Sequence, residues 1–169
     1  EKGQPYLAYG HDYHPDLPTD GNFLNNGLVD PYRNPHPHLH EVKKVYQPAT
    51  FEWSAKRSAL TITNKHFFSP LDDLLLQWTL LEDGVQVQGG EIAAITIQPQ
   101  RQQTIPIPAY LFKQNSEYVL RCQLVTKNER GLLQAGHELA FEQFVLQDYT
   151  APPASPQPAD QVSINQQGG

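Results

Sequence analysis

The sequence lacks several features on which large classes of protein depend. Its 169 residues include no methionine and one cysteine, which excludes an internal disulfide and any zinc site built on cysteines. No stretch approaches ~18 consecutive apolar residues, which excludes a membrane-spanning helix. The formal net charge is −6 and no run of basic residues occurs, so nucleic acid is not an expected partner. We expect a soluble protein, located in the cytoplasm or the periplasm.

The absence of methionine has a second meaning. Glu1 opens an ordinary run of residues with no initiator before it, as expected of a piece of a longer polypeptide. Aromatic residues make up 10% of the chain, which argues against a wholly disordered protein, because disordered chains have few residues able to bury apolar area. Cys122 lies between Leu120 and Leu124, a position typical of a small apolar residue in a strand.

Composition divides the chain into three zones. Residues 1–48 are rich in proline, glycine and histidine and predict a mostly irregular segment. Within them, Leu39, Val42 and Tyr46 form one apolar stripe, which predicts a single short helix over residues 38–46 with a proline beyond each end. A folded domain is expected at 49–147. Proline and small residues dominate 148–169, which predicts a linker and the start of a further domain.

The zone from 49 to 147 has the pattern of an all-β domain. Asp83-Gly84 predicts a hairpin, because a type I′ turn needs positive φ at both central residues. Gly89-Gly90 is expected to break the strand that follows, and two prolines within 104–108 suit an edge strand. Short strands at such intervals are typical of an immunoglobulin-like antiparallel β-sandwich. We predict about seven to eight strands, at residues 50–53, 59–63, 74–81, 85–88, 92–97, 104–108, 118–126 and 137–146.

The run His36-Pro-His-Leu-His40 is a candidate ligand set for Zn²⁺ or Cu²⁺. In an extended segment the alternate imidazoles would share one face. Because the run enters the predicted helix near His38, we expect the three imidazoles to fan around the helix axis. No further ligand completes a site beyond three candidates upstream, His11, Asp12 and His14. Exposed histidines at the start of a helix are therefore the favoured interpretation.

Two other sets of side chains are candidates for sugar chemistry. A glycosidase pair needs two carboxyl groups that face each other in a cleft, and nothing in the sequence brings two acids together in this way. Aspartates beside prolines more often bind their own backbone. Aromatic side chains of the second zone offer a stacking platform or, more commonly, part of the core. The acids are Asp12, Asp16, Asp20, Asp30 and Glu41, and the aromatic residues are Trp53, Phe67, Phe68 and Trp78.

Several motifs together resemble one known family. In order, they are Ala8-Tyr-Gly-His-Asp-Tyr13, Phe23-Leu-Asn-Asn-Gly-Leu-Val29 and Pro35-His-Pro-His-Leu-His-Glu-Val-Lys43. They resemble the closing stretch of the catalytic (β/α)₈ barrel in β-galactosidases of glycoside hydrolase family 2. Leu74-Leu-Leu-Gln-Trp78 and residues 135–144 resemble the second immunoglobulin-like domain, which follows that barrel. The resemblance extends over residues 6–147.

The resemblance implies which functional residues this chain holds. Both catalytic glutamates would lie on earlier barrel strands, so no catalytic residue is expected here. The carbonyl of Phe23 and the side-chain oxygen of Asn26 would bind Na⁺ beside the galactose, with Asp20 close by. Na⁺, and Mg²⁺ as a further candidate, would be cofactors of the parent enzyme only. The loop departs from the family pattern at five positions, namely His11, His14, Pro15, His38 and His40.

We therefore expect a non-catalytic fragment of a multidomain β-galactosidase that hydrolyses terminal β-galactosides. Its sandwich would serve as a structural spacer. Its partners would be the barrel and the following domain of the same polypeptide, with a β-galactoside bound in the parent. The apolar N-terminal segment is expected to promote self-association. Two alternatives stay open, a free-standing sandwich that stacks a sugar on Trp53 or Trp78, and a metal-binding protein that uses the histidine run.

Overall fold

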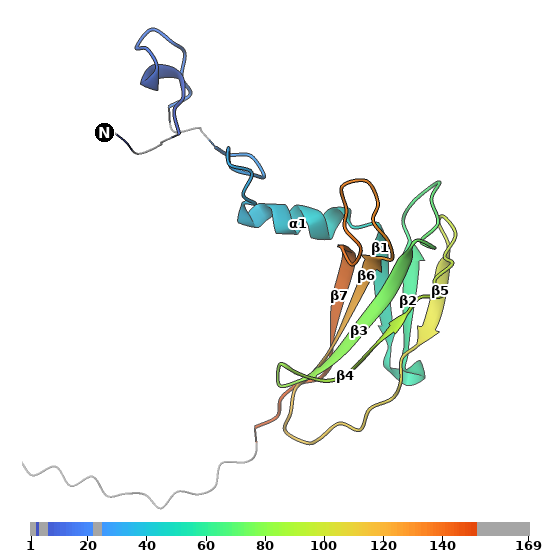
Figure 1. Cartoon of the computed structure of the whole chain (residues 1–169). Coiled ribbons are helices and arrows are strands. Elements are labelled where there is room, and N and C mark those ends of the chain that lie inside the picture. The colour runs from blue at the N-terminus through green and yellow to red at the C-terminus, as the bar shows by residue number, and fades with distance from the viewer. Residues whose placement is uncertain (1–2, 4–6, 22–24, 152–169) are drawn as a thin grey trace, which may run out of the picture.

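The computed structural model describes residues 3, 7–21 and 25–151, and most of them build a two-layered β-sandwich (Figure 1). One α-helix, α1 (Pro37–Tyr46), precedes it, and short 3₁₀ turns lie at Gly10–Asp12 and Ala55–Arg57. The predicted fold class, an immunoglobulin-like sandwich after a mostly irregular segment with one short helix, is confirmed. The strands are β1 (Ala49–Ser54), β2 (Ala59–Asn64), β3 (Leu74–Glu82), β4 (Val85–Ile92), β5 (Gln102–Pro106), β6 (Tyr118–Thr126) and β7 (Glu138–Gln147).

The strands form two antiparallel sheets. One has the order β1-β2-β5 and the other the order β4-β3-β6-β7. Strand β5, which ends at Pro106, lies at an edge of its sheet, where a proline costs no ladder hydrogen bond, as the prolines within 104–108 predicted. The predicted hairpin is also present, since Asp83 and Gly84 join β3 to β4 with φ angles of 49° and 80°.

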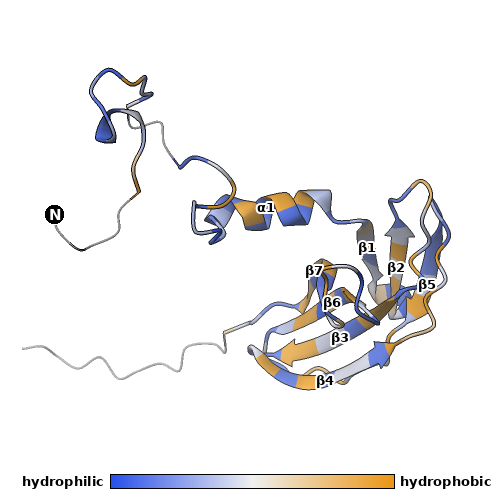
Figure 2. Ribbon diagram, turned by 45° about the horizontal axis from the view of Figure 1, so that its top comes forward, coloured by the Kyte–Doolittle hydropathy of each residue, from blue (hydrophilic) through white to orange (hydrophobic). Residues whose placement is uncertain are grey.

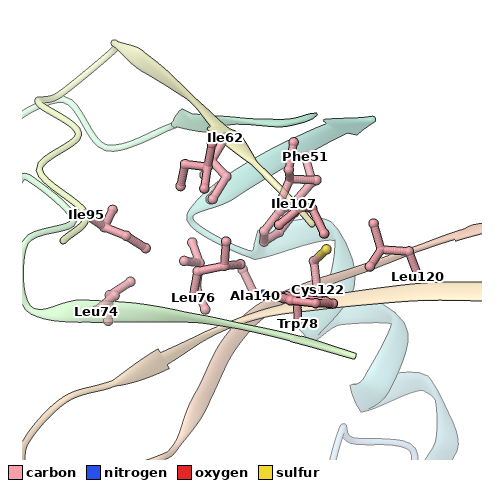
Figure 3. Close-up of a cluster of buried hydrophobic side chains, with 14 of the residues drawn as sticks. Phe51, Ile62, Leu74, Leu76, Trp78, Ile95, Ile107, Leu120, Cys122 and Ala140 are labelled. Carbon is pink, nitrogen blue, oxygen red and sulfur yellow. The ribbon is translucent and has the colours of Figure 1, made fainter. Parts of the chain in front are cut away.

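The core lies between the two sheets (Figure 3). Along β3 every second side chain is buried, because alternate residues of a strand point to opposite faces. Cys122 of β6 is fully buried among these side chains, and its burial raises the pKa of the thiol to about 12. The prediction of a small apolar strand residue at Cys122 is therefore confirmed. The β3 core residues are Leu74, Leu76, Trp78 and Leu80, and they face Phe51 of β1, Leu60 and Ile62 of β2.

The predicted break at Gly89-Gly90 is wrong, because β4 runs through both glycines. Gly90 lies directly opposite Trp78 in the ladder. A Cβ on Gly90 would lie 3.0 Å from Trp78 Nε1 and 3.2 Å from Cε2. The glycine therefore lets the indole pack against the backbone of the neighbouring strand, which keeps the strand intact.

The predicted strand at 92–97 is also absent beyond Ile92, where β4 ends. The alternation that suggested it is real, since Ile95 and Ile97 are 0% and 2% exposed. The carbonyl of Ile97, however, accepts hydrogen bonds from the Leu71 amide (3.1 Å) and the Asn64 side chain (3.1 Å). Its backbone thus binds a loop and a side chain instead of a neighbouring strand.

The domain limits at 48 and 147 stay predictions. Helix α1 ends at Tyr46 and β1 begins at Ala49, whereas most of the predicted linker, 152–169, lies outside the described residues. None of the helices in the described ranges is long and apolar enough to cross a membrane.

Candidate functional site

The loop that leads into α1 forms a small closed hairpin. Val29 and Pro35 make an isolated antiparallel bridge, and the His36 amide donates to the Leu28 carbonyl at 3.0 Å. At its tip, the Asp30 carboxylate accepts from the backbone N and side-chain Nδ2 of Asn34, both at 2.8 Å. The hydrogen bonds from Asn34 lower the pKa of Asp30. The expectation that an aspartate beside a proline binds its own segment is confirmed here.

Two histidines attach the beginning of this loop to the beginning of α1. His36 Nδ1 and His38 Nε2 lie 2.7 Å and 3.0 Å from the same oxygen, the carbonyl of Gly27. Their ring centres are 5.5 Å apart. The expectation that all three imidazoles of the run fan apart is therefore wrong for this pair, because His36 precedes the helix and its extended backbone turns the ring back toward the loop. His40 is exposed.

One of the two predicted sodium ligands, Asn26, stands next to this junction. Asn26 is exposed and immediately precedes Gly27, whose carbonyl the two histidines hold. Phe23 lies outside the described residues. No group of three or more histidine, cysteine or carboxylate side chains that could hold a metal occurs in the ranges 7–21 and 25–151.

The predicted acids near the loop are bound to their own segment. The Tyr9 hydroxyl donates to Asp20 Oδ2 at 3.2 Å, and the Tyr9 amide donates to Asp12 Oδ2 at 3.0 Å. The hydrogen bond and the negative charge of Asp20 raise the pKa of Tyr9. Asp16 lies 3.6 Å from His14, and Glu41 is exposed on α1. Each described contact of these aspartates is local, within 11 positions along the chain.

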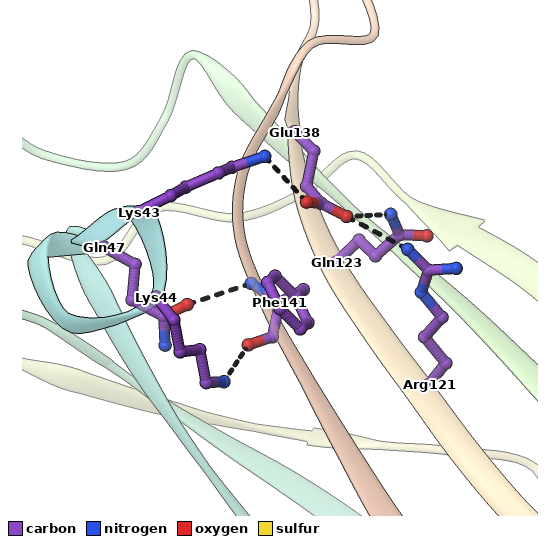
Figure 4. A network of polar contacts seen from close by, with 7 residues as sticks. All are labelled: Lys43, Lys44, Gln47, Arg121, Gln123, Glu138 and Phe141. Atoms are coloured by element: carbon purple, nitrogen blue, oxygen red, sulfur yellow. Dashed lines mark hydrogen bonds and ion pairs between the residues drawn. The ribbon is translucent and has the colours of Figure 1, made fainter. Parts of the chain in front are cut away.

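The other end of α1 is attached to the sandwich through Glu138, at the start of β7 (Figure 4). Lys43 Nζ lies 2.8 Å from Glu138 Oε1, and Arg121 Nη2 lies 3.2 Å from Oε2, which also accepts from the Gln123 amide. Burial acts to raise the pKa of Glu138, but the hydrogen bonds and positive charges of these partners outweigh it and hold that pKa below its ordinary value. Glu138 is therefore a charged anchor for the helix.

A second set of contacts occupies the backbone of Phe141 in β7. Lys44 Nζ donates to the Phe141 carbonyl at 2.6 Å and to Glu142 Oε2 at 2.9 Å. The Phe141 amide donates to Gln47 Oε1 at 3.2 Å (Figure 4). Because β7 lies at the edge of its sheet, these side chains satisfy backbone groups that no neighbouring strand reaches.

The end of the helix thus binds the sandwich through polar side chains. At 100° per residue, Lys43 lies beside the stripe formed by Leu39, Val42 and Tyr46, and Lys44 lies nearly opposite it. Gln47 follows the last turn of the helix. Val45 and Tyr46 are 68% and 80% exposed. This polar interface was not predicted from the sequence, although the adjacent lysines in the last turn of the helix, Lys43 and Lys44, are a signal that could have indicated it.

The aromatic candidates of the sandwich have different environments. Trp78 is 5% exposed, which agrees with a core residue. Trp53 is only partly buried and lines a cavity of about 210 Å³ between the sheets. Phe67 and Phe68 are 73% and 95% exposed. Other residues that line the cavity are Trp78, Pro108, Tyr110, Phe112 and Leu146.

Comparison with known proteins places these features in a family. Residues 60–147 match the family described as "Beta-galactosidase, domain 4", and residues 1–51 match "Glycosyl hydrolases family 2, TIM barrel domain". β-Galactosidases of Priestia megaterium and Photobacterium profundum are 34% and 36% identical to this chain over 99% and 85% of its length. The aligned regions are 16% and 14% of those proteins. The chain therefore spans about a sixth of the length of these relatives.

One solved structure, an exo-chitosanase of Amycolatopsis orientalis, aligns with 73% of this chain and 14% of its own, at 16% identity and a TM-score of 0.48. The family assignment does not depend on it, since the domain 4 model alone covers more than half of the 169 residues. The chain belongs to the β-galactosidases of glycosyl hydrolase family 2 and comprises their domain 4 together with a segment of the TIM-barrel domain.

Proposed function

We propose that this chain is a non-catalytic part of a β-galactosidase in which the sandwich holds a loop of the sugar site in place. In the parent enzyme the loop would supply the Phe23 carbonyl and the Asn26 side-chain oxygen to a Na⁺ ion beside the bound galactoside. A hard monovalent cation favours neutral oxygen ligands, and the exposed Asn26 side chain fits this requirement. Bound there, Na⁺ would supply a positive charge that orients a sugar hydroxyl.

The observation that carries this proposal is a series of polar contacts from the sandwich through α1 to Gly27, the residue after Asn26. Glu138 and Phe141 of β7 bind the last turns of α1. His36 and His38 at its first turn bind the carbonyl of Gly27, next to Asn26. The exposed side chains of Val45 and Tyr46 leave apolar area of the helix for the barrel of the parent. The sandwich would thus fix one wall of a pocket without entering it.

The absence of catalysis is part of the proposal. Glycoside hydrolysis needs two carboxyl groups facing the scissile bond. The aspartates of the N-terminal segment instead make local contacts, Asp12 and Asp20 with Tyr9, and Asp30 with Asn34. We expect the isolated chain to release no aryl alcohol from an aryl β-galactoside. Turnover above the buffer rate that is abolished by one substitution within these residues would contradict the proposal.

The sodium site is tested in the intact parent enzyme. Asn26→Ala should raise the KM for an aryl β-galactoside about tenfold or more and remove activation by Na⁺, because one charge-assisted contact contributes about 1.5–3 kcal/mol. The matched control is Asn25→Gly, since Asn25 has a φ of 62° that glycine adopts without strain. Equal effects of both substitutions would argue for a general distortion of the loop and against a ligand role for Asn26.

A second candidate function, sugar binding by the sandwich itself, has one observation in its favour. The cavity that Trp53 lines also includes Tyr110 and Phe112, and aromatic faces of this kind stack on sugar rings. Galactose or lactose should then quench the tryptophan fluorescence of the chain, and Phe112→Ala should remove the effect. Unchanged fluorescence at saturating sugar would reject this candidate.

A further inference from the structure

We propose that His36 and His38, together with the carbonyl of Gly27, form a binding site for a divalent transition-metal ion of the Cu²⁺ or Zn²⁺ type. This site is separate from the sodium site of the proposed function and does not depend on it. It assigns to His36 and His38 a role beyond holding the Gly27 carbonyl.

The geometry of the two imidazoles already approaches that of a chelate. His36 Nδ1 and His38 Nε2 point at one oxygen, at 2.7 Å and 3.0 Å. Two imidazoles on one tetrahedral ion, with metal–nitrogen distances of about 2.0–2.1 Å, have ring centres about 5 Å apart. The observed separation of 5.5 Å is close to this value. A small inward movement of the rings would place both nitrogens on one ion.

The donor set determines which ions the site would take. Neutral imidazole nitrogens favour copper, zinc and nickel, whereas Mg²⁺ and Na⁺ favour oxygen ligands. On binding, each ring nitrogen that donates to Gly27 would give up its proton, and the other nitrogen of the same ring would carry the proton instead. The Gly27 carbonyl would change from hydrogen-bond acceptor to third ligand. Both histidines are at least partly open to solvent, so water can complete the coordination.

The same run supplies a matched control. His40 is exposed and lies two residues beyond His38 in α1, which turns it by more than half of a circle around the helix axis. Its imidazole is the same kind of ligand as that of His38, but it has no access to the Gly27 carbonyl. If the metal binds at the proposed site, substitution of His38 will lower the affinity and substitution of His40 will not. If the metal binds loosely to any surface histidine, the two substitutions will have similar effects.

The test is calorimetric titration of the full, untagged chain with Zn²⁺, and electron paramagnetic resonance of the chain with one equivalent of Cu²⁺. We expect one tight site and a copper spectrum split by two nitrogens. His38→Ala should lower the affinity at least 10- to 100-fold, since even the loss of a partner behind a ligand costs that much. His40→Ala should change the affinity less than twofold. Alanine favours helices, so neither substitution weakens α1.

A second variant guards against an indirect effect. His36→Asn removes the imidazole but keeps a residue that is favoured before the first turn of a helix, so α1 should retain its circular dichroism while metal binding is lost. Equal losses in His38→Ala and His40→Ala, unchanged affinity in His38→Ala, or a copper spectrum with one nitrogen would each overturn the proposal.

Discussion

The N-terminal segment (residues 7–21 and 25–48) and the sandwich (residues 49–147) are held together by different forces. In the sandwich, alternate strand residues are buried in one apolar core. Helix α1, along which Figure 2 shows both hydrophobic and hydrophilic residues, has no buried residue. Tyr13 and Tyr32 are 72% and 61% exposed, while Leu76 and Ile62 are fully buried. The N-terminal segment is instead held by hydrogen bonds to its own Gly27 and by hydrogen bonds and an ion pair with Glu138 and Phe141 of the sandwich.

This difference indicates that the sandwich is stabilised by its own core, whereas the N-terminal segment is ordered by its polar contacts, including those with the sandwich. Burial of apolar side chains is the main favourable term in folding, and polar contacts at partly exposed sites contribute little each. Segments with few buried apolar contacts open locally at low free-energy cost. In the parent, the apolar side of α1 would obtain its burial from the barrel. Four substitutions test this comparison.

The largest effect is expected in the core. Leu76→Ala removes a fully buried side chain from the centre of β3 and should lower the free energy of unfolding by about 2–5 kcal/mol in urea denaturation. Leu17→Ala removes the same atoms from a side chain of the N-terminal segment that is 43% exposed. It should change the free energy of unfolding by less than about 0.5 kcal/mol. If both variants lost a comparable free energy of unfolding, the N-terminal segment and the sandwich would share one core.

A smaller effect is expected where β4 passes Trp78. Gly90→Ala would place a methyl group 3.0–3.2 Å from the indole, so the ring must shift, at a cost of about 1–3 kcal/mol. The fluorescence spectrum of Trp78 should shift together with the urea midpoint. Gln86→Ala, on the exposed side of the same strand, should stay within about 0.5 kcal/mol. Stabilisation by Gly90→Ala would mean that the gain in backbone stiffness outweighs the close contact.

The sequence predicted the sandwich well because its signals are periodic and local. Alternation located β3, β6 and β7 to within about two residues, and Asp83-Gly84 located the hairpin by its turn conformation. The errors arose where a distant residue decides the outcome. Gly89-Gly90 resembles a break until Trp78 is known to lie opposite, and the pairing of Ile97 depends on the Asn64 side chain.

The candidate site was predicted less completely. A run of three histidines shows only that imidazoles are close in sequence, and whether they converge depends on the turn at His36 that brings Gly27 back to the helix. The anchor made by Lys43 and Glu138 joins residues 95 positions apart, which no local pattern reveals. Sequence periodicity predicted the apolar stripe of α1, but the hydrogen bonds to the sandwich come from Lys43, Lys44 and Gln47.

The anchor at Glu138 should depend on pH. Glu138→Gln keeps the shape of the side chain and removes its charge, so α1 should open more readily, by up to about 1 kcal/mol at pH 7. Hydrogen exchange of the amides in 37–46 measures this change. Because the folded pKa of Glu138 lies below its ordinary value near 4.5, the carboxylate stabilises docking above that value. The contribution is lost as the pH falls through the depressed pKa.

The difference between wild type and Glu138→Gln should therefore shrink as the solution is acidified from pH 5 to about pH 3, since protonated Glu138 and glutamine carry the same charge. Glu129→Gln, in the exposed loop before β7, is the control and should leave the exchange of α1 unchanged at each pH. A difference that stays constant with pH would show that Glu138 acts through shape and not through charge.

The smallest effect on stability is expected at Tyr46, although the change bears directly on self-association. Its side chain is 80% exposed, so Tyr46→Ser should alter the free energy of unfolding by less than about 0.5 kcal/mol.

If the apolar side of α1 pairs with a second copy when the barrel is missing, wild type should sediment faster as its concentration rises, and the substitution should weaken this trend. Tyr149→Ser removes an equivalent side chain, 58% exposed, after β7 and should not. A wild-type chain that sediments as a monomer at every concentration would contradict self-association. The exposed side chains of Val45 and Tyr46 would then be tolerated in water without any partner.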